Sequence, residues 1–207
     1  GKIQDKLGSD SLSMAKYDSM SRSSYLMAFQ MDSTKEGVIK EIADSLYNQK
    51  RYDEAGFFYF ARAKSTNLAA DYFYATRADY LGGNYVRGME AAQGIINKLP
   101  DELAGHLWLA RNAALLDTIN KGAMAVPLYE MVITKGNIDK AKNGKDILEA
   151  LNWLTVYNIN IKQDYVKAQS YNDQALEIDA NNEQVMKLFN FLTDVTTNPP
   201  KKSTKKG

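Results

Sequence analysis

Apolar residues recur at helical spacing along most of the chain, in segments separated by short polar turns. One segment has apolar residues at alternating offsets of one and three, which places them on one face of a helix. Its members are Val38, Ile39, Ile42, Ala43, Leu46 and Tyr47. The same pattern predicts helices over 33–47, 52–64, 68–81, 85–99, 102–116, 124–134, 147–161 and 165–178, and a last helix over about 181–195. Residues 12–31 fit one or two helices imperfectly.

Turn-forming residues stand where this pattern breaks. Ser33 and Glu36 have the spacing of a capping box, in which each side chain covers a backbone N–H at the start of a helix. Gly82 and Gly83 can end the preceding segment, because glycine accepts left-handed backbone angles. Pro100 cannot continue a helix. The chain is therefore predicted to consist of helices joined in pairs by short turns.

An internal repeat shows in two arginines with matching surroundings. Arg77 follows Tyr-Phe-Tyr-Ala-Thr, and Arg111, 34 residues later, follows His-Leu-Trp-Leu-Ala. Tyr52 and Tyr165 share a Tyr-x-x-Ala pattern, and Tyr85 repeats the tyrosine. A period of 34 residues is typical of helix-turn-helix units that stack into a solenoid, where each unit is buried by its neighbours.

The repeat pattern predicts one continuous helical domain over residues 12–195, with a capping helix at its C-terminal end. Residues 1–11 and the lysine-rich tail 196–207 are expected to be disordered. Residues 135–146 hold two glycines and four lysines and break the pattern. We interpret this segment as an exposed linker with room for a short helical piece.

At these positions the chain resembles the tetratricopeptide repeat (TPR) family. The most complete unit places the family's aromatic, small and glycine positions at Tyr72, Ala75, Thr76, Gly83, Tyr85, Gly88 and Pro100. No unit is a full match: Lys50 stands where glycine is usual, and Ala180 where proline is usual. The resemblance implies an all-α, right-handed α-solenoid of about four TPR-like repeats. The stretch from Trp108 into the lysine-rich segment is also similar to exported TPR-like proteins of Bacteroidetes.

Composition narrows the function classes. The net charge of +1 gives no global basic field, so no nucleic-acid partner is expected. The chain has no cysteine, which excludes disulfides and thiolate chemistry, and no apolar run approaches the roughly 20 residues of a transmembrane helix. Because the sequence begins with Gly1, we expect it to be truncated, with any signal peptide or lipid anchor lost. The resemblance favours a periplasmic or cell-envelope location, and a cytoplasmic one stays open.

The sequence offers no catalytic set, so we predict a non-enzyme without cofactor or metal. His106 is the single histidine, and its repeat position matches that of Tyr72, which indicates a structural role. One histidine without cysteine gives no triad of the usual kind and a poor set of zinc ligands. Gly82-Gly83 is not followed by Lys-Ser/Thr and is therefore no phosphate-binding loop.

The family's geometry implies which side chains face the concave groove. Besides Lys40, Asp44 and Tyr47, the candidate peptide-binding residues are Phe73, Arg77, Tyr80, Leu107, Arg111, Trp153 and Tyr157. Arg77 and Arg111 would stack about 10 Å apart and could hold an acidic or C-terminal carboxylate. The alternative is that each arginine pairs with a carboxylate of its own chain. The lysine/asparagine clamp of chaperone-binding relatives is not visible, because Asp44 stands at one of its positions.

Two functions of different classes follow from this sequence. The first is a non-catalytic scaffold whose groove binds a protein or peptide partner through a few aromatic and arginine anchors. The alternative is a structural or self-association module of a larger envelope-associated protein. The expected oligomeric state is a monomer or a weak homodimer, and concentration-dependent scattering would separate the two functions.

Overall fold

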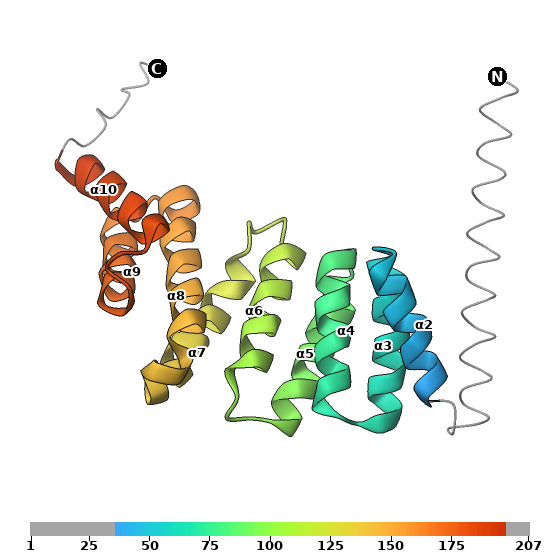
Figure 1. The fold of residues 1–207 in the computed structure, drawn as a ribbon. Coiled ribbons are helices and arrows are strands. Elements are labelled where there is room, and N and C mark those ends of the chain that lie inside the picture. The colour runs from blue at the N-terminus through green and yellow to red at the C-terminus, as the bar shows by residue number, and fades with distance from the viewer. Residues whose placement is uncertain (1–35, 198–207) are drawn as a thin grey trace, which may run out of the picture. The chain divides into compact units, whose positions relative to one another are not determined.

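The computed structural model describes residues 36–197, and this part of the chain is built from helices (Figure 1). The α-helices are α2 (Glu36–Asn48), α3 (Tyr52–Thr66), α4 (Ala69–Gly82), α5 (Tyr85–Lys98), α6 (Leu103–Leu116), α7 (Val126–Gly136), α8 (Lys140–Tyr157), α9 (Tyr165–Ile178) and α10 (Glu183–Thr197). Short 3-10 turns cover Ala123–Ala125 and Asn137–Asp139, and a π turn covers Asn158–Lys162. The predicted all-α fold class is confirmed.

Several expectations fall outside the described residues. They are the disordered segment 1–11, the imperfect helices of 12–31 and the side chains of the Ser33–Glu36 capping box. The predicted disordered tail began at residue 196, but α10 continues to Thr197, and the tail from residue 198 on is not described.

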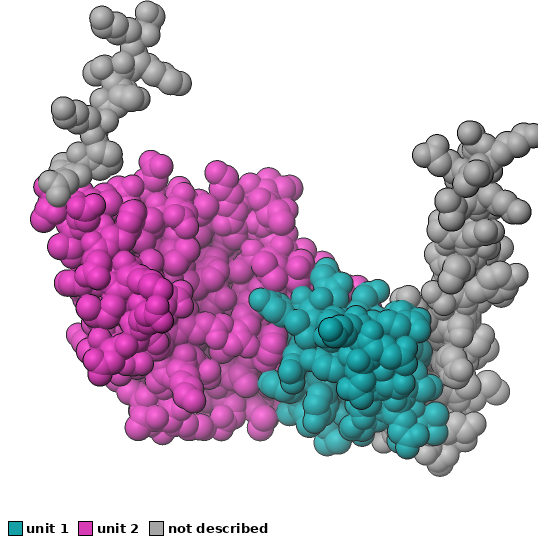
Figure 2. All heavy atoms as spheres, turned by 45° about the horizontal axis from the view of Figure 1, so that its top comes forward, with its two compact units in different colours: residues 1–83 teal, residues 84–207 magenta. Residues whose placement is uncertain are grey.

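The chain divides into two compact units, Gly1–Gly83 and Asn84–Gly207 (Figure 2). The first, here called unit 1, contains α2 to α4, and the second, unit 2, contains α5 to α10. The expectation of a single continuous domain over residues 12–195 stays a prediction.

The described part of unit 1 consists of three packed helices, α2 on α3 and α3 on α4. Its core combines small and large side chains: Ile39, Ala43, Leu46, Ala55, Phe58, Ala63, Tyr72, Ala75 and Ala78. Alanine at these positions lets helix backbones approach closely, and the larger residues fill the space that remains. Val38 was expected on the buried stripe of α2, but it is 49 % exposed, because the buried stripe is narrower than the apolar pattern.

The end of α4 depends on two glycines. Gly83 follows the helix at φ 79°, in the left-handed region that glycine enters without a Cβ clash. Gly82 has ordinary helical angles, but a Cβ added there would overlap the backbone of Asp53 at the start of α3. The pair therefore ends α4 and also allows it to lie directly against α3.

In unit 2 consecutive helices from α5 to α10 pack on one another. A core cluster joins α6, α7, α8 and α9 with the start of α10, and includes Leu107, Tyr129, Val132, Leu151 and Val185. A second cluster of Ile159, Ala168 and Leu192 holds α10 against α9 and the π turn. The predicted terminal helix is therefore present and covers the last helix pair with its apolar face.

The segment 135–146 is largely exposed, as predicted, but it is not a linker, because most of it forms the first turns of α8. Asp139 caps the helix by accepting a hydrogen bond from the backbone N–H of Lys142 at 3.0 Å. The Lys142 ammonium lies 2.8 Å from the Glu102 carboxylate at the start of α6. Lysine is a good helix former, so a lysine-rich segment with a cap and a buried Ile147 behind it is compatible with helix.

Candidate functional site

The described part of unit 1 contains a pocket of about 250 Å³. Its lining comes from all three helices: Asp44, Tyr47 and Asn48 from α2, Tyr59 from α3, and Tyr74 and Arg77 from α4. These six residues are called the tyrosine pocket below. Asp44 and Asn48 are four residues apart on α2 and therefore share one helix face.

Tyrosine rings form the walls of this pocket. Tyr59 and Tyr74 are stacked with ring centroids 5.5 Å apart, which joins α3 to α4. Tyr47 meets Tyr59 edge to face at 6.4 Å, and Tyr52 in the same manner at 5.1 Å. Offset and edge-to-face aromatic pairs stabilise each other beyond their buried area, so these walls are held by their mutual contacts.

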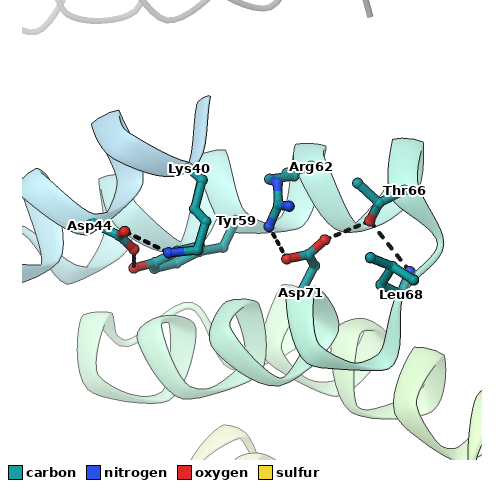
Figure 3. A network of polar contacts seen from close by, with 7 residues as sticks. All are labelled: Lys40, Asp44, Tyr59, Arg62, Thr66, Leu68 and Asp71. Carbon is teal, nitrogen blue, oxygen red and sulfur yellow. Dashed lines mark hydrogen bonds and ion pairs between the residues drawn. The ribbon is translucent and has the colours of Figure 1, made fainter. Parts of the chain in front are cut away.

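Asp44 is neutralised within the pocket by residues of its own unit (Figure 3). Lys40 donates to one carboxylate oxygen at 2.6 Å, and the Tyr59 hydroxyl donates to the other at 2.6 Å. Burial alone would raise the pKa of Asp44, but these two hydrogen bonds outweigh it and hold the pKa below its usual value. Burial and the neighbouring Asp44 carboxylate raise the pKa of Tyr59.

Arg77 has a different environment. Its guanidinium lies over the Tyr47 ring, 5.6 Å from the ring centroid, and the residue is exposed. Among residues 36–197, no carboxylate forms an ion pair with it. The ring supports one face of the guanidinium, and its N–H donors lie in the plane of the group, where a ligand can reach them.

A second polar network in unit 1 holds α3 against α4 at the loop between them. Asp71 is 2 % exposed and accepts hydrogen bonds from Arg62 and, at 2.6 Å, from the Thr66 hydroxyl (Figure 3). The Thr66 hydroxyl in turn accepts from the backbone N–H of Leu68 at 3.3 Å. This network fixes where α4 begins, and it therefore sets the position of Tyr74 and Arg77 one and two turns later.

Of the groove residues predicted on α2 and α4, Asp44, Tyr47 and Arg77 line the tyrosine pocket, and Lys40 does not line it. Phe73 and Tyr80 are half-buried on α4 and do not line it. The sequence reasoning missed Asn48, Tyr59 and Tyr74. Tyr74 is adjacent to Phe73, so the predicted register differs by one position on the helix. Tyr59 lies on α3, whereas the family's geometry assigns the groove to the first helix of each repeat.

In unit 2 the candidate Arg111 is paired with a carboxylate of the chain. Its Nε and Nη2 donate to the two carboxylate oxygens of Glu149 on α8, at 2.7 and 2.5 Å. The guanidinium also lies over the Trp108 ring at 4.5 Å. Burial lowers the pKa of Arg111, but the bond to Glu149 raises it by more. Of the two alternatives for the arginines, Arg111 takes the internal pair, and its stacking with Arg77 stays a prediction because they belong to different units.

Two other candidates of unit 2 are core residues rather than groove residues. Leu107 is 3 % exposed and Tyr157 is 5 % exposed, so a ligand has little access to either. Trp153 is half-buried between Tyr129 and Tyr157, with ring centroids at 4.5 and 5.2 Å. Trp153 borders a hollow of about 520 Å³ between α8 and α10, which Lys145, Leu148, Glu149, Asn152, Val156 and Gln184 also line.

Comparison with known proteins adds one informative likeness. No protein-family model matches this sequence, and no curated protein matches it. A solved structure does: the C-terminal part of a TPR repeat-containing protein from Cytophaga hutchinsonii, at 24 % identity and a TM-score of 0.67. The likeness covers 84 % of this chain and 67 % of that one. The chain has the TPR fold.

The TPR fold explains the alternation of helices around the two pockets. In this arrangement α2, α4, α6 and α8 are each the first helix of a helix-turn-helix repeat. They carry Asp44, Arg77, Arg111 and Trp153, respectively. Tyr59 lies on α3, the second helix of its repeat. It still lines the tyrosine pocket, because its side chain reaches both neighbouring first helices: its hydroxyl bonds Asp44 on α2, and its ring stacks on Tyr74 on α4.

His106 is buried, at 7 % exposure, on α6 of the TPR fold. One ring nitrogen lies 3.4 Å from the carbonyl oxygen of Pro100. Burial lowers the pKa of His106, as expected for an imidazole held neutral in the fold. The described residues contain no group of three or more histidine, aspartate or glutamate side chains placed to hold a metal ion. None of the described helices is long and apolar enough to cross a membrane.

Proposed function

We propose that this chain is a non-catalytic scaffold that binds a protein or peptide partner, and that the tyrosine pocket of unit 1 is an anchor of the binding surface. The observation that carries the proposal is the exposed Arg77 guanidinium beside a tyrosine-walled hollow, without an ion-pair partner among residues 36–197. Arginine and tyrosine are enriched among the residues that dominate binding energy at protein interfaces.

The fold supports the same proposal in a general way. A TPR-like array of helices presents an extended surface rather than a closed catalytic cleft, and such surfaces suit partner segments. The half-buried Trp153 and its neighbouring hollow offer a second contact area in unit 2. Arg111 is not an anchor in this proposal, because Glu149 already occupies its two donor groups.

The proposal is tested by affinity capture from envelope and cytosolic extracts with the wild-type chain beside Arg77→Gln. The matched control is Arg51→Gln, which removes a surface arginine bonded to Glu54 and outside the tyrosine pocket. We expect a partner that the wild type and Arg51→Gln retain and Arg77→Gln loses. The fraction that yields the partner also indicates the compartment.

Equal capture by all three proteins would place the binding surface away from the tyrosine pocket. No capture by the wild type, together with light scattering that rises with concentration, would favour the alternative of a self-association module. A folded state of each variant is verified first by circular dichroism, so that loss of capture reports on binding.

A further inference from the structure

We propose that the tyrosine pocket binds the side-chain carboxylate of an acidic residue within a partner peptide. This inference rests on the proposed function and names the chemistry of its anchor. It follows from the charges of the pocket, from the donors that face it and from its size.

Among the charges that the structure describes in and around the pocket, a single positive group is uncompensated. Asp44 is matched by Lys40 at 2.6 Å, and its second oxygen is occupied by the Tyr59 hydroxyl. Arg77 has no such partner among the described residues, and its guanidinium lies over the neutral Tyr47 ring. The pocket therefore attracts an anion at one place, the edge of the Arg77 guanidinium.

The donors suit a carboxylate. A guanidinium presents parallel N–H groups that match two carboxylate oxygens, which is the pairing that Arg111 makes with Glu149 in unit 2. Asn48, exposed on the same pocket wall, adds an amide N–H₂ donor. A phosphate dianion is less suitable, because Arg77 is the one unpaired cation that residues 36–197 bring to the pocket, and the Asp44 carboxylate lies in the same wall.

The size and walls favour a side chain over a chain end. A volume of about 250 Å³ accommodates one side chain, and the faces of Tyr47, Tyr59 and Tyr74 can pack against its methylene groups. A C-terminal residue would bring its carboxylate, its last peptide unit and its own side chain into the same hollow. We therefore assign the pocket to aspartate or glutamate at an internal position of an extended segment.

The test begins with a random dodecapeptide library displayed on phage and selected against the full chain. The best sequences are then synthesised with acetylated N-termini and amidated C-termini, each beside a version in which the acidic residue is changed to its amide. Binding of every peptide to the wild type, Arg77→Gln and Arg51→Gln is measured by fluorescence anisotropy. Amidation removes the terminal carboxylate, so any remaining dependence on charge belongs to the side chain.

We expect the acid-to-amide change to weaken binding to the wild type and to Arg51→Gln about tenfold or more, as for a hydrogen-bonded charge pair. The same change should have little effect on binding to Arg77→Gln, because the partner of the carboxylate is then absent. Nuclear magnetic resonance signals of the Asn48 side-chain amide should shift with the acidic peptide and not with its amide version.

Other outcomes separate this inference from the proposed function. If the wild type selects peptides whose binding does not depend on an acidic side chain, or depends on a free C-terminus, the pocket assignment is wrong and the scaffold function stands. An equal loss on acid-to-amide change in the wild type and Arg77→Gln also refutes the assignment. If no peptide is selected, both the inference and the peptide-binding form of the proposed function fail.

Discussion

Burial determines what the single histidine of this chain can do. His106 is surrounded by α6 and the loop that precedes it, with the Pro100 carbonyl oxygen as its hydrogen-bond acceptor. Burial is the main cause that lowers the pKa of His106, Lys135 lowers it further, and the bond to Pro100 opposes both. The folded state therefore prefers neutral imidazole, while the unfolded chain titrates near the ordinary value of 6.5.

The pH dependence of stability follows from this difference. Between the lowered pKa of the folded state and 6.5, the unfolded chain binds more protons, so the free energy of unfolding decreases as the pH falls through this window. One group contributes a slope of at most about 1.4 kcal/mol per pH unit. We expect His106→Gln, which can still donate to Pro100, to have a flatter profile than the wild type between pH 7.5 and 5.5.

The measurement is urea unfolding of both proteins across that range, followed by circular dichroism. The difference between the two profiles isolates His106, because all other titrating groups are shared. If the two slopes are the same, the imidazole titrates alike in both states and burial does not control its pKa.

Residue identity predicted the structural role of His106 but not the environments of the arginines. Arg77 and Arg111 match in the repeat, yet Glu149 on α8 pairs with Arg111, while no carboxylate among residues 36–197 pairs with Arg77. The partner is 38 residues away in sequence, and nothing in the local pattern around either arginine indicates it. The groove prediction for Leu107 is wrong for a related reason. Its repeat position indicates which side of the helix it lies on, whereas its burial depends on the neighbouring helices.

At the scale of elements, alanine substitutions at the glycines of unit 1 should change stability by different amounts. Gly82→Ala places a Cβ against the Asp53 backbone, which cannot move aside as a flexible side chain can. We expect a loss of about 1–3 kcal/mol in the free energy of unfolding, as for an overpacked core. Gly83→Ala keeps open space around the Cβ but forces φ 79° on alanine, and should cost about 1 kcal/mol.

Gly37→Ala in α2 is the matched control. A Cβ at Gly37 meets nothing within 4 Å, and the residue is helical, so the substitution should be neutral or stabilise by up to about 1 kcal/mol. Chemical denaturation of the three variants tests the expected order of their stabilities, with Gly37→Ala the most stable and Gly82→Ala the least. A Gly82→Ala variant as stable as the wild type would mean that α3 and α4 can separate at this end without cost.

Helix periodicity predicted most elements because each buries an apolar stripe that recurs at i, i+3 and i+4. It failed at residues 135–146, where the first turns of α8 have no such stripe before Ile147. There the helix is held by the Asp139 cap and by the ion pair between Lys142 and Glu102, which joins α8 to α6. Contacts of this kind become visible only when the neighbouring helix is in place.

At the scale of the whole molecule, the repeat period predicted the TPR fold, which the solved structure from Cytophaga hutchinsonii matches. The period could not predict the division into two units, because every predicted helix pair has the same form. The core cluster that runs from Leu107 to Val185 contains no residue of unit 1.

Because this cluster lies within unit 2, we expect unit 2 to fold by itself. We expect a fragment of residues 84–207 to retain helical circular dichroism and to unfold cooperatively on heating. The matched control is a fragment of residues 123–207, which lacks Leu107, Ala110 and Ala113 and so opens the cluster against which α7 and α8 pack. Because each helix of a repeat array is buried by its neighbours, this shorter fragment should lose the cooperative transition. An unfolded 84–207 fragment would instead show that the core of unit 2 depends on unit 1 for its stability.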